Sequence, residues 1–353
     1  MNKKGGDTLS SRASHSLTTR PQNPTSQEAR FTAFMGNLAL IEERNKAEGP
    51  NGATHGWTKF IDLTPAEFKE RYLKSTSGPK KDIEQVSLPT LGAGEGASKD
   101  WTGVYTTPVK DQGQCGSCWA FSATEQIESD VQRELGEKYT LSPQQITSCD
   151  EYDNGCGGGN TETAYKYVKE SKGMVLESDY PYTSGHGGRH SSCIEKDLTK
   201  PVIDVKGFKT IGQSAYANGK SGVESAMAKY VGATGPLSIC VDASSWQTYK
   251  GGVLKHCGEQ IDHCVQAVGI DTDKGIWKVR NSWNTDWGED GFIRLQYGQD
   301  SCGLTNDPTW VTVIDATPSP APIADLKAVE EDILSPRPTE VAKLTESIKE
   351  LEK

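Results

Sequence analysis

This sequence lacks a membrane span, a basic stripe and an N-glycosylation acceptor. Its 353 residues contain no apolar run long enough to span a bilayer. The net charge is −10, and acidic and basic residues are interspersed, without the basic stripe that tracks nucleic acid. These two absences predict neither a membrane nor a nucleic acid as a partner. No Asn-x-Ser/Thr acceptor with x other than Pro is present either, so N-glycan anchoring or targeting receives no support.

The N-terminal stretch also lacks the apolar middle of a signal peptide, although it carries lysines. This absence contrasts with the cysteine content. Nine cysteines are more than a reduced cytosolic protein of this size usually carries, which favours an oxidising compartment, either a lysosome or vacuole or the outside of the cell. Because nine is odd, at least one thiol must stay unpaired.

The chain divides into four regions of different composition, 1–27, 28–90, 91–315 and 316–353. The first is rich in Ser, Thr, Pro and Asn, which predicts a disordered leader. The second has the apolar periodicity of two helices, too small a module to stand alone, so we expect it to lean on the larger third region. The fourth combines a Pro-rich linker with helical stretches, which is typical of either a solvated tail helix or a helix that docks on a partner.

The apolar face predicted for the first helix of the second region comprises Phe31, Phe34, Leu38, Ile41 and Asn45. In the second helix, Thr64 is the expected N-cap, Pro65 takes the first helical position and Glu67 the third, close to a capping box. The following stretch, 77–100, has the Gly, Ser and charge content of an exposed linker that a protease can cut.

The third region changes in character along its length. Residues 118–135 carry apolar side chains at helical spacing and are followed by Gly136, a typical C-cap residue. Two shorter helices are predicted within 141–149 and 160–173. Beyond residue 200 the pattern is that of strands separated by Gly-rich turns. The body is therefore predicted to be a mostly helical half followed by a β half.

Cys115 and Cys118 form a Cys-x-x-Cys pair, and three kinds of site use such a pair. A zinc site needs two more ligands at close spacing, but Cys149 and Cys156 lie seven apart with no further pair or His at ligand spacing. A thioredoxin-like dithiol follows the first strand of a βαβ unit, whereas this pair follows a turn-rich loop. The third possibility is one structural cysteine beside one reactive thiol at the start of a helix.

A reactive Cys118 requires a base, because a free thiol at neutral pH is only a few per cent thiolate. The β half offers His263 and, after it, Asn281, whose side-chain carbonyl can hold the second ring nitrogen of a histidine. These three residues then make a nucleophile, a base and an orienting group. The residues alone leave a purely structural role open for the histidine and the asparagine.

Three stretches in this order, QGQCGSCWAF, DHCVQAVG and NSWNTDWGEDGF, resemble the active-site blocks of papain-like cysteine peptidases. The resemblance runs from about Trp101 to Trp310. The second region resembles the inhibitory prosegment of the cathepsin L-like branch. The positions that carry this second resemblance are Arg30, Phe34, Asn37, Ile41 and Asn45, followed by Gly56, Phe60 and Asp62.

The resemblance implies an α+β fold, the papain-like two-lobed fold with a helical lobe and a β-barrel-like lobe, preceded by a small helical prosegment. It implies that Cys118 is the nucleophile and that His263 is the base, oriented by Asn281. Gln112 and the backbone N–H of Cys118 would bind the oxyanion, and Trp283 would shield the hydrogen bond of the histidine from water. The substrate-binding positions that the family implies are Gly158, Gly159, Cys240, Ile261, Asp262, Cys264, Trp283 and Asp307.

The same resemblance pairs six cysteines as disulfides, namely Cys115 with Cys156, Cys149 with Cys193, and Cys257 with Cys302. Cys240 and Cys264 remain, on strands that the family fold places side by side. They form either a fourth disulfide or two small apolar walls of the pocket for the second residue before the cut.

We therefore expect a cysteine endopeptidase made as a latent zymogen, which acts on peptide and protein substrates without a metal or another cofactor. Its own prosegment is expected to inhibit it by crossing the cleft in the direction opposite to substrate, and acid should loosen this docking by protonating carboxylates such as Asp62. Bulky apolar residues are expected at the second position before the cut, with Arg tolerated because of Asp307. A monomer that also binds cystatin-like inhibitors fits the resemblance. The rival hypotheses are an inactive family member that acts as a binding protein and a dithiol oxidoreductase.

Overall fold

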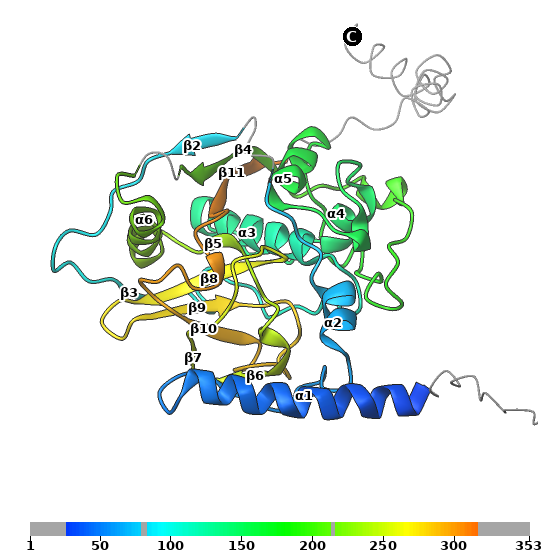
Figure 1. Ribbon diagram of the computed structural model, residues 1–353. Coiled ribbons are helices and arrows are strands. Elements are labelled where there is room, and N and C mark those ends of the chain that lie inside the picture. Colours follow the sequence, from blue (N-terminus) through cyan, green and yellow to red (C-terminus); the bar gives the residue numbers. More distant parts are fainter. Residues whose placement is uncertain (1–25, 79–82, 213–215, 317–353) are drawn as a thin grey trace, which may run out of the picture.

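The computed structural model describes residues 26–78, 83–212 and 216–316, so the expected tail helix and nearly all of the expected leader lie outside the described residues. Figure 1 shows helices α3 to α5 grouped together, a twisted sheet beside them, and helix α1 along the opposite edge of the molecule. This combination confirms the predicted α+β class. Within the described residues, no helix combines the length and the apolar character that crossing a membrane needs.

The helical part follows the predicted helices closely. Helix α3 ends at Gly136, whose φ of 76° is left-handed, as expected for a C-cap glycine. Ser142 and Asn160 cap α4 and α5 by accepting hydrogen bonds from backbone N–H groups of the first turns. The apolar faces of the three helices form one core with strands β4 and β11, which holds α3 in place. The bounds are α3 Cys118–Leu135, α4 Pro143–Cys149 and α5 Thr161–Glu170.

The β part is built on one nine-stranded sheet in the order β2-β4-β11-β5-β8-β9-β10-β7, with β3 added beside β8. The central pairs, β5 with β8 and β8 with β9, are antiparallel. A separate pair joins β1 (Thr54–His55) of the N-terminal region to β6 (Tyr249–Gly251). The remaining strands are β2 Glu84–Val86, β3 Ser98–Asp100, β4 Ile203–Ile211, β5 Leu237–Val241, β7 Val253–Leu254, β8 His263–Asp271, β9 Ile276–Arg280, β10 Phe292–Gln296 and β11 Thr309–Asp315. Short 3-10 helices are η1 Gly155–Gly157, η2 Glu195–Leu198, η4 Trp246–Thr248 and η5 Ser301–Gly303.

Helix α6 (Gly219–Ala233) lies within the half that the sequence predicted to consist of strands, so that prediction is wrong here. Val223, Met227 and Val231 recur at four-residue spacing and are fully buried in the same core as the sheet. Glycines and serines lower the helix propensity of this stretch and hide its period. Tertiary packing on the sheet, rather than local propensity, stabilises the helix.

The N-terminal region contains the two predicted helices, α1 (Ser26–Glu48) and α2 (Pro65–Tyr72). Helix α1 begins two residues before the expected boundary, inside the predicted leader. The capping box is confirmed, because Thr64 Oγ1 accepts from the N–H of Glu67 and the Glu67 carboxylate accepts from the N–H of Thr64.

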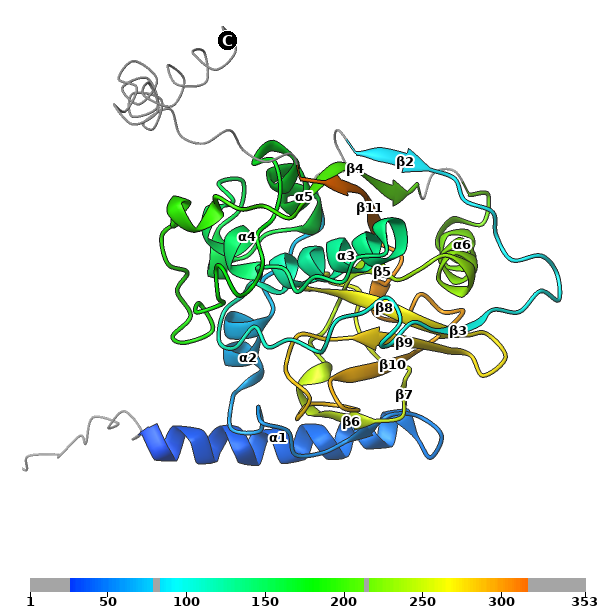
Figure 2. The same ribbon diagram turned by 180° about the vertical axis from the view of Figure 1, so that it is seen from behind.

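The apolar face predicted for α1 is only partly correct. Phe31 is 64% exposed, whereas Ala33 and Asn37 are buried. The side-chain nitrogen of Asn37 donates to the carbonyls of Ile61 and Leu63, both at 2.7 Å, so a polar side chain ties α1 to the segment before α2. Because α1 lies along the edge of the body (Figure 2), only a narrow side of it is covered.

The stretch predicted as an exposed linker, 77–100, is only partly loop. Strand β2 pairs in parallel with β4, and β3 pairs antiparallel with β8. Between these strands the chain passes around α6 (Figure 1), where the N–H of Leu91 donates to Ser225 Oγ at 3.0 Å. The edge strand β4 and the end of β8 beyond its pairing with β5 supply backbone partners for this segment, which composition alone does not reveal.

Candidate active site

Cys118 is the first residue of α3, and its side chain is completely buried. All nine cysteines lie in the described residues, and Cys118 is the one that is not part of a disulfide. The bonded pairs are Cys115–Cys156, Cys149–Cys193, Cys240–Cys264 and Cys257–Cys302. Since Cys115 is bonded to Cys156, the zinc and dithiol interpretations of the Cys-x-x-Cys pair are wrong.

Strands β8 and β9 bring His263 and Asn281 together. His263 begins β8, and Asn281 directly follows β9, its antiparallel neighbour. His263 Nε2 lies 2.7 Å from Asn281 Oδ1, and both side chains are fully buried. The imidazole and the thiol of Cys118 interact electrostatically, and because Nε2 faces Asn281, Nδ1 is the ring nitrogen that remains for the thiol. The ring of Trp283 stacks on the imidazole, with 4.7 Å between the ring centroids.

Two opposing effects set the charge state of this pair. Burial raises the pKa of the Cys118 thiol, but the lowering effects, of which the charge of His263 is the largest, outweigh burial and bring the pKa to about 7. Burial likewise opposes the charged form of His263, yet its attraction to the thiolate raises the pKa of the imidazole. The N-terminus of α3 adds a positive partial charge beside the sulfur. The two side chains therefore stabilise each other as thiolate and imidazolium.

Gln112 holds its side-chain amide beside the start of α3. Its Oε1 accepts hydrogen bonds from Ser282 Oγ at 2.7 Å and Trp283 Nε1 at 3.1 Å, which fixes the amide nitrogen on the other side. Nε2 donates to the carbonyl of Cys115 at 2.9 Å and to the carbonyl of Tyr72 at 3.1 Å. The carbonyl of Tyr72, in the N-terminal region, therefore accepts a hydrogen bond from the side-chain amide of Gln112.

Residues 96–312 match the family model described as papain family cysteine protease, and residues 22–68 match the cathepsin propeptide inhibitor domain (I29). The chain belongs to the papain family of cysteine proteases. Cysteine proteinase B of Leishmania mexicana is 36% identical over 319 residues, which cover 84% of this chain and 69% of that protein. Cathepsin L 1 of Paramecium tetraurelia is 37% identical over 298 residues, which cover 82% of this chain and 88% of that protein.

Solved structures of two precursor proteins have the same fold. A recombinant stem bromelain precursor has a TM-score of 0.68 at 29% identity, covering 83% of this chain and 94% of that one. Digestive procathepsin L 3 of the Tenebrio molitor larval midgut has a TM-score of 0.67 at 26% identity, with the same coverage. These matches confirm the papain-like fold and the cathepsin L-like branch. The protein is a cysteine endopeptidase made as a zymogen, with its own propeptide as inhibitor.

The propeptide of this papain-family protease passes through the active site. Ser75 Oγ lies 3.0 Å from Cys118 Sγ, and the N–H of Ser75 donates to the carbonyl of Asp262 at 3.0 Å. The next residue, Thr76, donates its N–H to the carbonyl of Gly159 at 3.0 Å, beside a parallel bridge between Ser75 and Gly159. Figure 1 shows the chain leaving α2 and running between the helical group and the sheet. Two of the expected substrate positions thus bind the propeptide backbone.

Aromatic rings of the propeptide cover the imidazole side of the site. Phe60, Phe68 and Tyr72 each pack edge-on against one ring of the catalytic domain, that of Trp283, with centroid distances of 5.3, 5.3 and 6.3 Å. Trp283 is itself fully buried and lies on His263. The hydrogen bond between His263 and its asparagine partner is thereby separated from solvent in the zymogen.

Arg30 makes the charged contacts between helix α1 and the segment around α2. It donates to the backbone carbonyl of Asp62 and pairs with the carboxylate of Glu67. The hydrogen bond from Arg30 lowers the pKa of Glu67 to about 2. A histidine that the sequence did not single out, His55, is buried at the β1–β6 pair, where its Nδ1 lies 3.0 Å from Thr248 Oγ1.

Two carboxylates lie beside Gly78, three residues beyond the contact between Ser75 and Cys118. The N–H of Gly78 lies 3.3 Å from Asp307 Oδ2, and a Cβ on Gly78 would lie 2.4 Å from the carboxyl carbon of Glu162. Asp307 is 1% exposed and Glu162 is 3% exposed. Sequence reasoning missed Glu162, although its place three residues after Gly159, in the first turn of α5, was an available signal.

The structure also places the remaining expected substrate positions, Cys240, Cys264, Gly158 and Ile261. Cys240 and Cys264 lie in register on β5 and β8 and are joined by a disulfide, so the alternative of two free thiols is wrong. Gly158 lets the propeptide approach closely, because a Cβ there would lie 2.2 Å from the carbonyl oxygen of Lys74. Ile261 is half-buried against η5.

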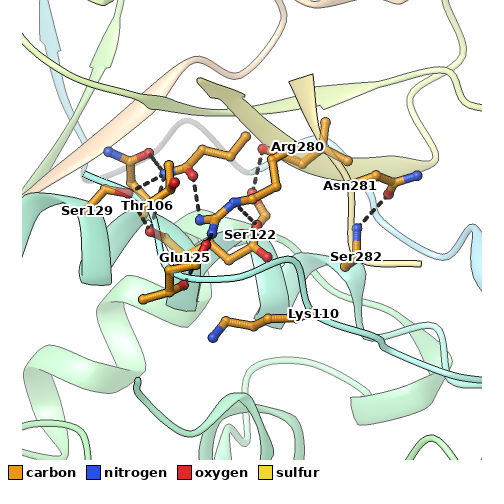
Figure 3. Close-up of polar contacts among 12 residues, drawn as sticks. Thr106, Lys110, Ser122, Glu125, Ser129, Arg280, Asn281 and Ser282 are labelled. Carbon is orange, nitrogen blue, oxygen red and sulfur yellow. Dashed lines mark hydrogen bonds and ion pairs between the residues drawn. The ribbon is translucent and has the colours of Figure 1, made fainter. Parts of the chain in front are cut away.

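A buried ion pair joins α3 to β9 next to Asn281 (Figure 3). Arg280 Nε lies 3.4 Å from Glu125 Oε2, and both side chains are buried. Arg280 also donates to Gln266 Oε1 at 2.6 Å. Sequence reasoning missed this pair, although Glu125 lies seven residues after Cys118 and therefore on the same side of the helix. The pair holds the strand that leads to Asn281 against the helix that begins at Cys118.

Proposed function

We propose that Cys118, His263 and Asn281 hydrolyse peptide bonds, and that Gln112 Nε2 and the backbone N–H of Cys118 bind the oxyanion. The observation that carries this proposal is the 2.7 Å contact between His263 Nε2 and Asn281 Oδ1, because it leaves Nδ1 for the thiol. Although burial opposes it, the charge of His263 helps to lower the pKa of Cys118 to about 7, which supports the thiolate as the attacking form.

The proposed reaction has two halves. The thiolate of Cys118 attacks the carbonyl carbon, a C–S bond forms, and the carbonyl electron pair moves to the oxygen, where the donors of the oxyanion site receive it. As the intermediate collapses, the C–N bond breaks and the leaving amine takes the proton from the imidazolium of His263. In the second half the neutral imidazole takes a proton from water, the hydroxide attacks the thioester, and the acid product leaves with the thiolate restored.

We propose the following organisation of the chain: residues 28–90 are the inhibitory propeptide, 91–315 the catalytic domain, and 316–353 a linker and tail that the chemistry does not need. The parallel bridge between Ser75 and Gly159 supports latency. A substrate that pairs antiparallel with Gly159 would run the other way and present its carbonyl to the thiolate. A cut within 77–100 would then free the cleft.

The disulfides support a proposal for the compartment in which the enzyme works. Four disulfides support an oxidising compartment, for which we propose the lysosome or vacuole or secretion. We propose that the mature enzyme is a monomer, and that cystatin-like inhibitors can enter the cleft that the propeptide leaves.

For the second substrate position before the cut we propose a preference for bulky apolar side chains, with Arg tolerated. The joined sulfurs of Cys240 and Cys264 offer an apolar wall. Filling an apolar pocket with Leu or Phe contributes about 1.5–3 kcal/mol. Once the propeptide leaves, the carboxylates of Asp307 and Glu162 are solvated, and an ion pair with Arg there contributes about 0–1 kcal/mol.

A labelling experiment tests the proposed nucleophile. An epoxide that alkylates thiolates is added to the intact zymogen and to the acid-activated enzyme, and the modified peptide is identified by mass spectrometry. The proposal predicts modification of Cys118 alone, in step with loss of peptidase activity and much faster after activation. Full loss of activity without modification of Cys118 would refute it.

A further inference from the structure

The hydroxyl of Tyr182 links the two parts of the chain that form the proposed oxyanion site. It donates a hydrogen bond to the backbone carbonyl of Gln112 at 2.8 Å and lies 2.8 Å from the hydroxyl of Ser117, the residue directly before Cys118. Because the carbonyl can only accept, the proton on Ser117 completes the chain from Ser117 through Tyr182 to Gln112. The hydroxyl of Tyr182 therefore contacts Gln112 itself and Ser117, the neighbour of Cys118. Gln112 and Cys118 are the two residues proposed to supply the oxyanion donors.

Tyr182 is itself held firmly. Its own N–H donates to Glu177 Oε1 at 2.9 Å, and its ring packs edge-on against Phe121 of α3 with 4.7 Å between centroids. The next residue, Thr183, donates its N–H to Gln144 Oε1 of α4 at 2.7 Å. Burial raises the pKa of the phenol, so the hydroxyl keeps the proton that it donates. These contacts attach the hydroxyl to the rigid helical lobe.

The bridge also explains an exception at the start of α3. Ser is a preferred N-cap residue, yet Ser117 makes no side-chain capping hydrogen bond. Its hydroxyl is turned to Tyr182 instead. The N–H of Cys118 is at the first helical position, which has no partner within the helix, so an oxyanion beside the N-terminus can accept from it.

We propose that Tyr182 is a positioning residue for the oxyanion site, which fixes the backbone of Gln112 relative to the N-terminus of α3. The proposal rests on the proposed roles of Gln112 and Cys118. Gln112 is held from the other side by its N–H, which donates to the carbonyl of Ser282 at 2.9 Å. Without the phenol hydroxyl, the backbone of Gln112 keeps only the hydrogen bond to Ser282. The side-chain amide of Gln112 then loses its fixed position relative to the sulfur of Cys118.

The test is Tyr182→Phe, matured in trans by a separate protease and counted by epoxide titration of the active thiol. Removing an oxyanion donor outright costs about a hundredfold or more in kcat, so loosening one should cost about tenfold, with KM changed less than about twofold. Alkylation of the thiol by iodoacetamide needs the thiolate but no oxyanion site, so its rate and pH profile should stay those of the wild type. This second readout separates positioning from a general loss of structure.

The matched control is Tyr180→Phe, which removes a buried phenol that accepts from the N–H of Ile194, away from Gln112. It should leave kcat unchanged. If Tyr182→Phe fails to fold, Ser117→Ala breaks the same bridge from its other end and must also lower kcat without slowing alkylation. Wild-type kcat in the folded variant, or an equal loss in alkylation rate and in kcat, overturns the proposal. Absence of epoxide labelling at Cys118 in the wild type would instead refute the proposed function.

Discussion

The hydroxyl of Ser75 lies 3.0 Å from the sulfur of Cys118. The propeptide therefore meets the thiol with a side-chain hydroxyl, while the carbonyl that bonds Gln112 Nε2 belongs to Tyr72, three residues earlier. The two groups that a scissile carbonyl would use together are thus engaged by different residues of the propeptide. This separation gives a physical reason why the segment blocks the site without being cut in it.

Replacement of Ser75 by Ala should loosen the block at the thiol. A hydrogen bond of this kind contributes about 0.5–1.5 kcal/mol, so alkylation of Cys118 in the intact zymogen at neutral pH should become about two- to tenfold faster. Ser77→Ala is the control, because Ser77 Oγ contacts Asn306 Nδ2 and not the sulfur. An unchanged alkylation rate in Ser75→Ala would show that the hydroxyl does not contribute to latency.

His55 should set the pH at which the propeptide loosens. Burial, and then the charge of Arg44, lower its pKa from 6.5 to about 4 in the folded zymogen, while Glu48 acts in the opposite direction. Because the docked state binds the proton less readily than the released state, docking is strongest above pH 6.5 and weakens as the pH falls towards 4.

The variant His55→Gln can still accept a hydrogen bond near Thr248 but cannot titrate, so its activation midpoint should move to lower pH. The measurement is the rate of propeptide cleavage between pH about 7 and 3, with the exposed His186→Gln as control. A midpoint that stays at the wild-type value would assign the acid response to other groups, such as Glu67.

The carboxylates near Gly78 should govern acceptance of basic residues. In the mature enzyme, Asp307→Asn and Glu162→Gln should each lower kcat/KM more for substrates with Arg at the second position before the cut than for matched substrates with Leu. The expected difference is about fivefold or less, the size of a partly solvated ion pair. The exposed Asp179→Asn is the control for the change in net charge. A wild-type profile in which Arg exceeds Leu would contradict the proposed apolar preference.

The disulfide between Cys240 and Cys264 has a simple chemical signature. With four disulfides, the denatured and unreduced protein should expose a single thiol, whereas separate thiols at these positions would give three. Cys240→Ser should lower the free energy of unfolding by about 2–4 kcal/mol through loss of the cross-link. A count of three thiols would show that the two sulfurs line the pocket separately.

The sequence predicted the features that depend on interactions between residues close together in the chain. The capping box at Thr64 and Glu67 and the helix end at Gly136 each rest on backbone groups a few residues away. Helix α6 escaped prediction because packing on the sheet outweighs the low propensity of its glycines. The exposure of Phe31 was not predicted either, because its helix contacts the body along one narrow side only.

At the site, the motifs indicated Cys118, His263 and Asn281, and the structure brings these three side chains together. The groups that support them were not visible in the sequence. Tyr182 and Glu125 act through partners 70 and 155 positions away in the chain, and only the fold brings such pairs together. The same holds for Ser75, whose role depends on the path of the propeptide.

Peptide hydrolysis by purified Cys118→Ala shows whether the thiolate of Cys118 cleaves the peptide bond. The variant is matured in trans, freed of the added protease, and compared with the wild type at equal concentration and equal thermal stability. The account predicts turnover at the level of the buffer blank, because no other group of the site can form the thioester. Turnover within about tenfold of the wild type would contradict it, since loss of a nucleophile in a comparable triad costs about 10⁶ in kcat.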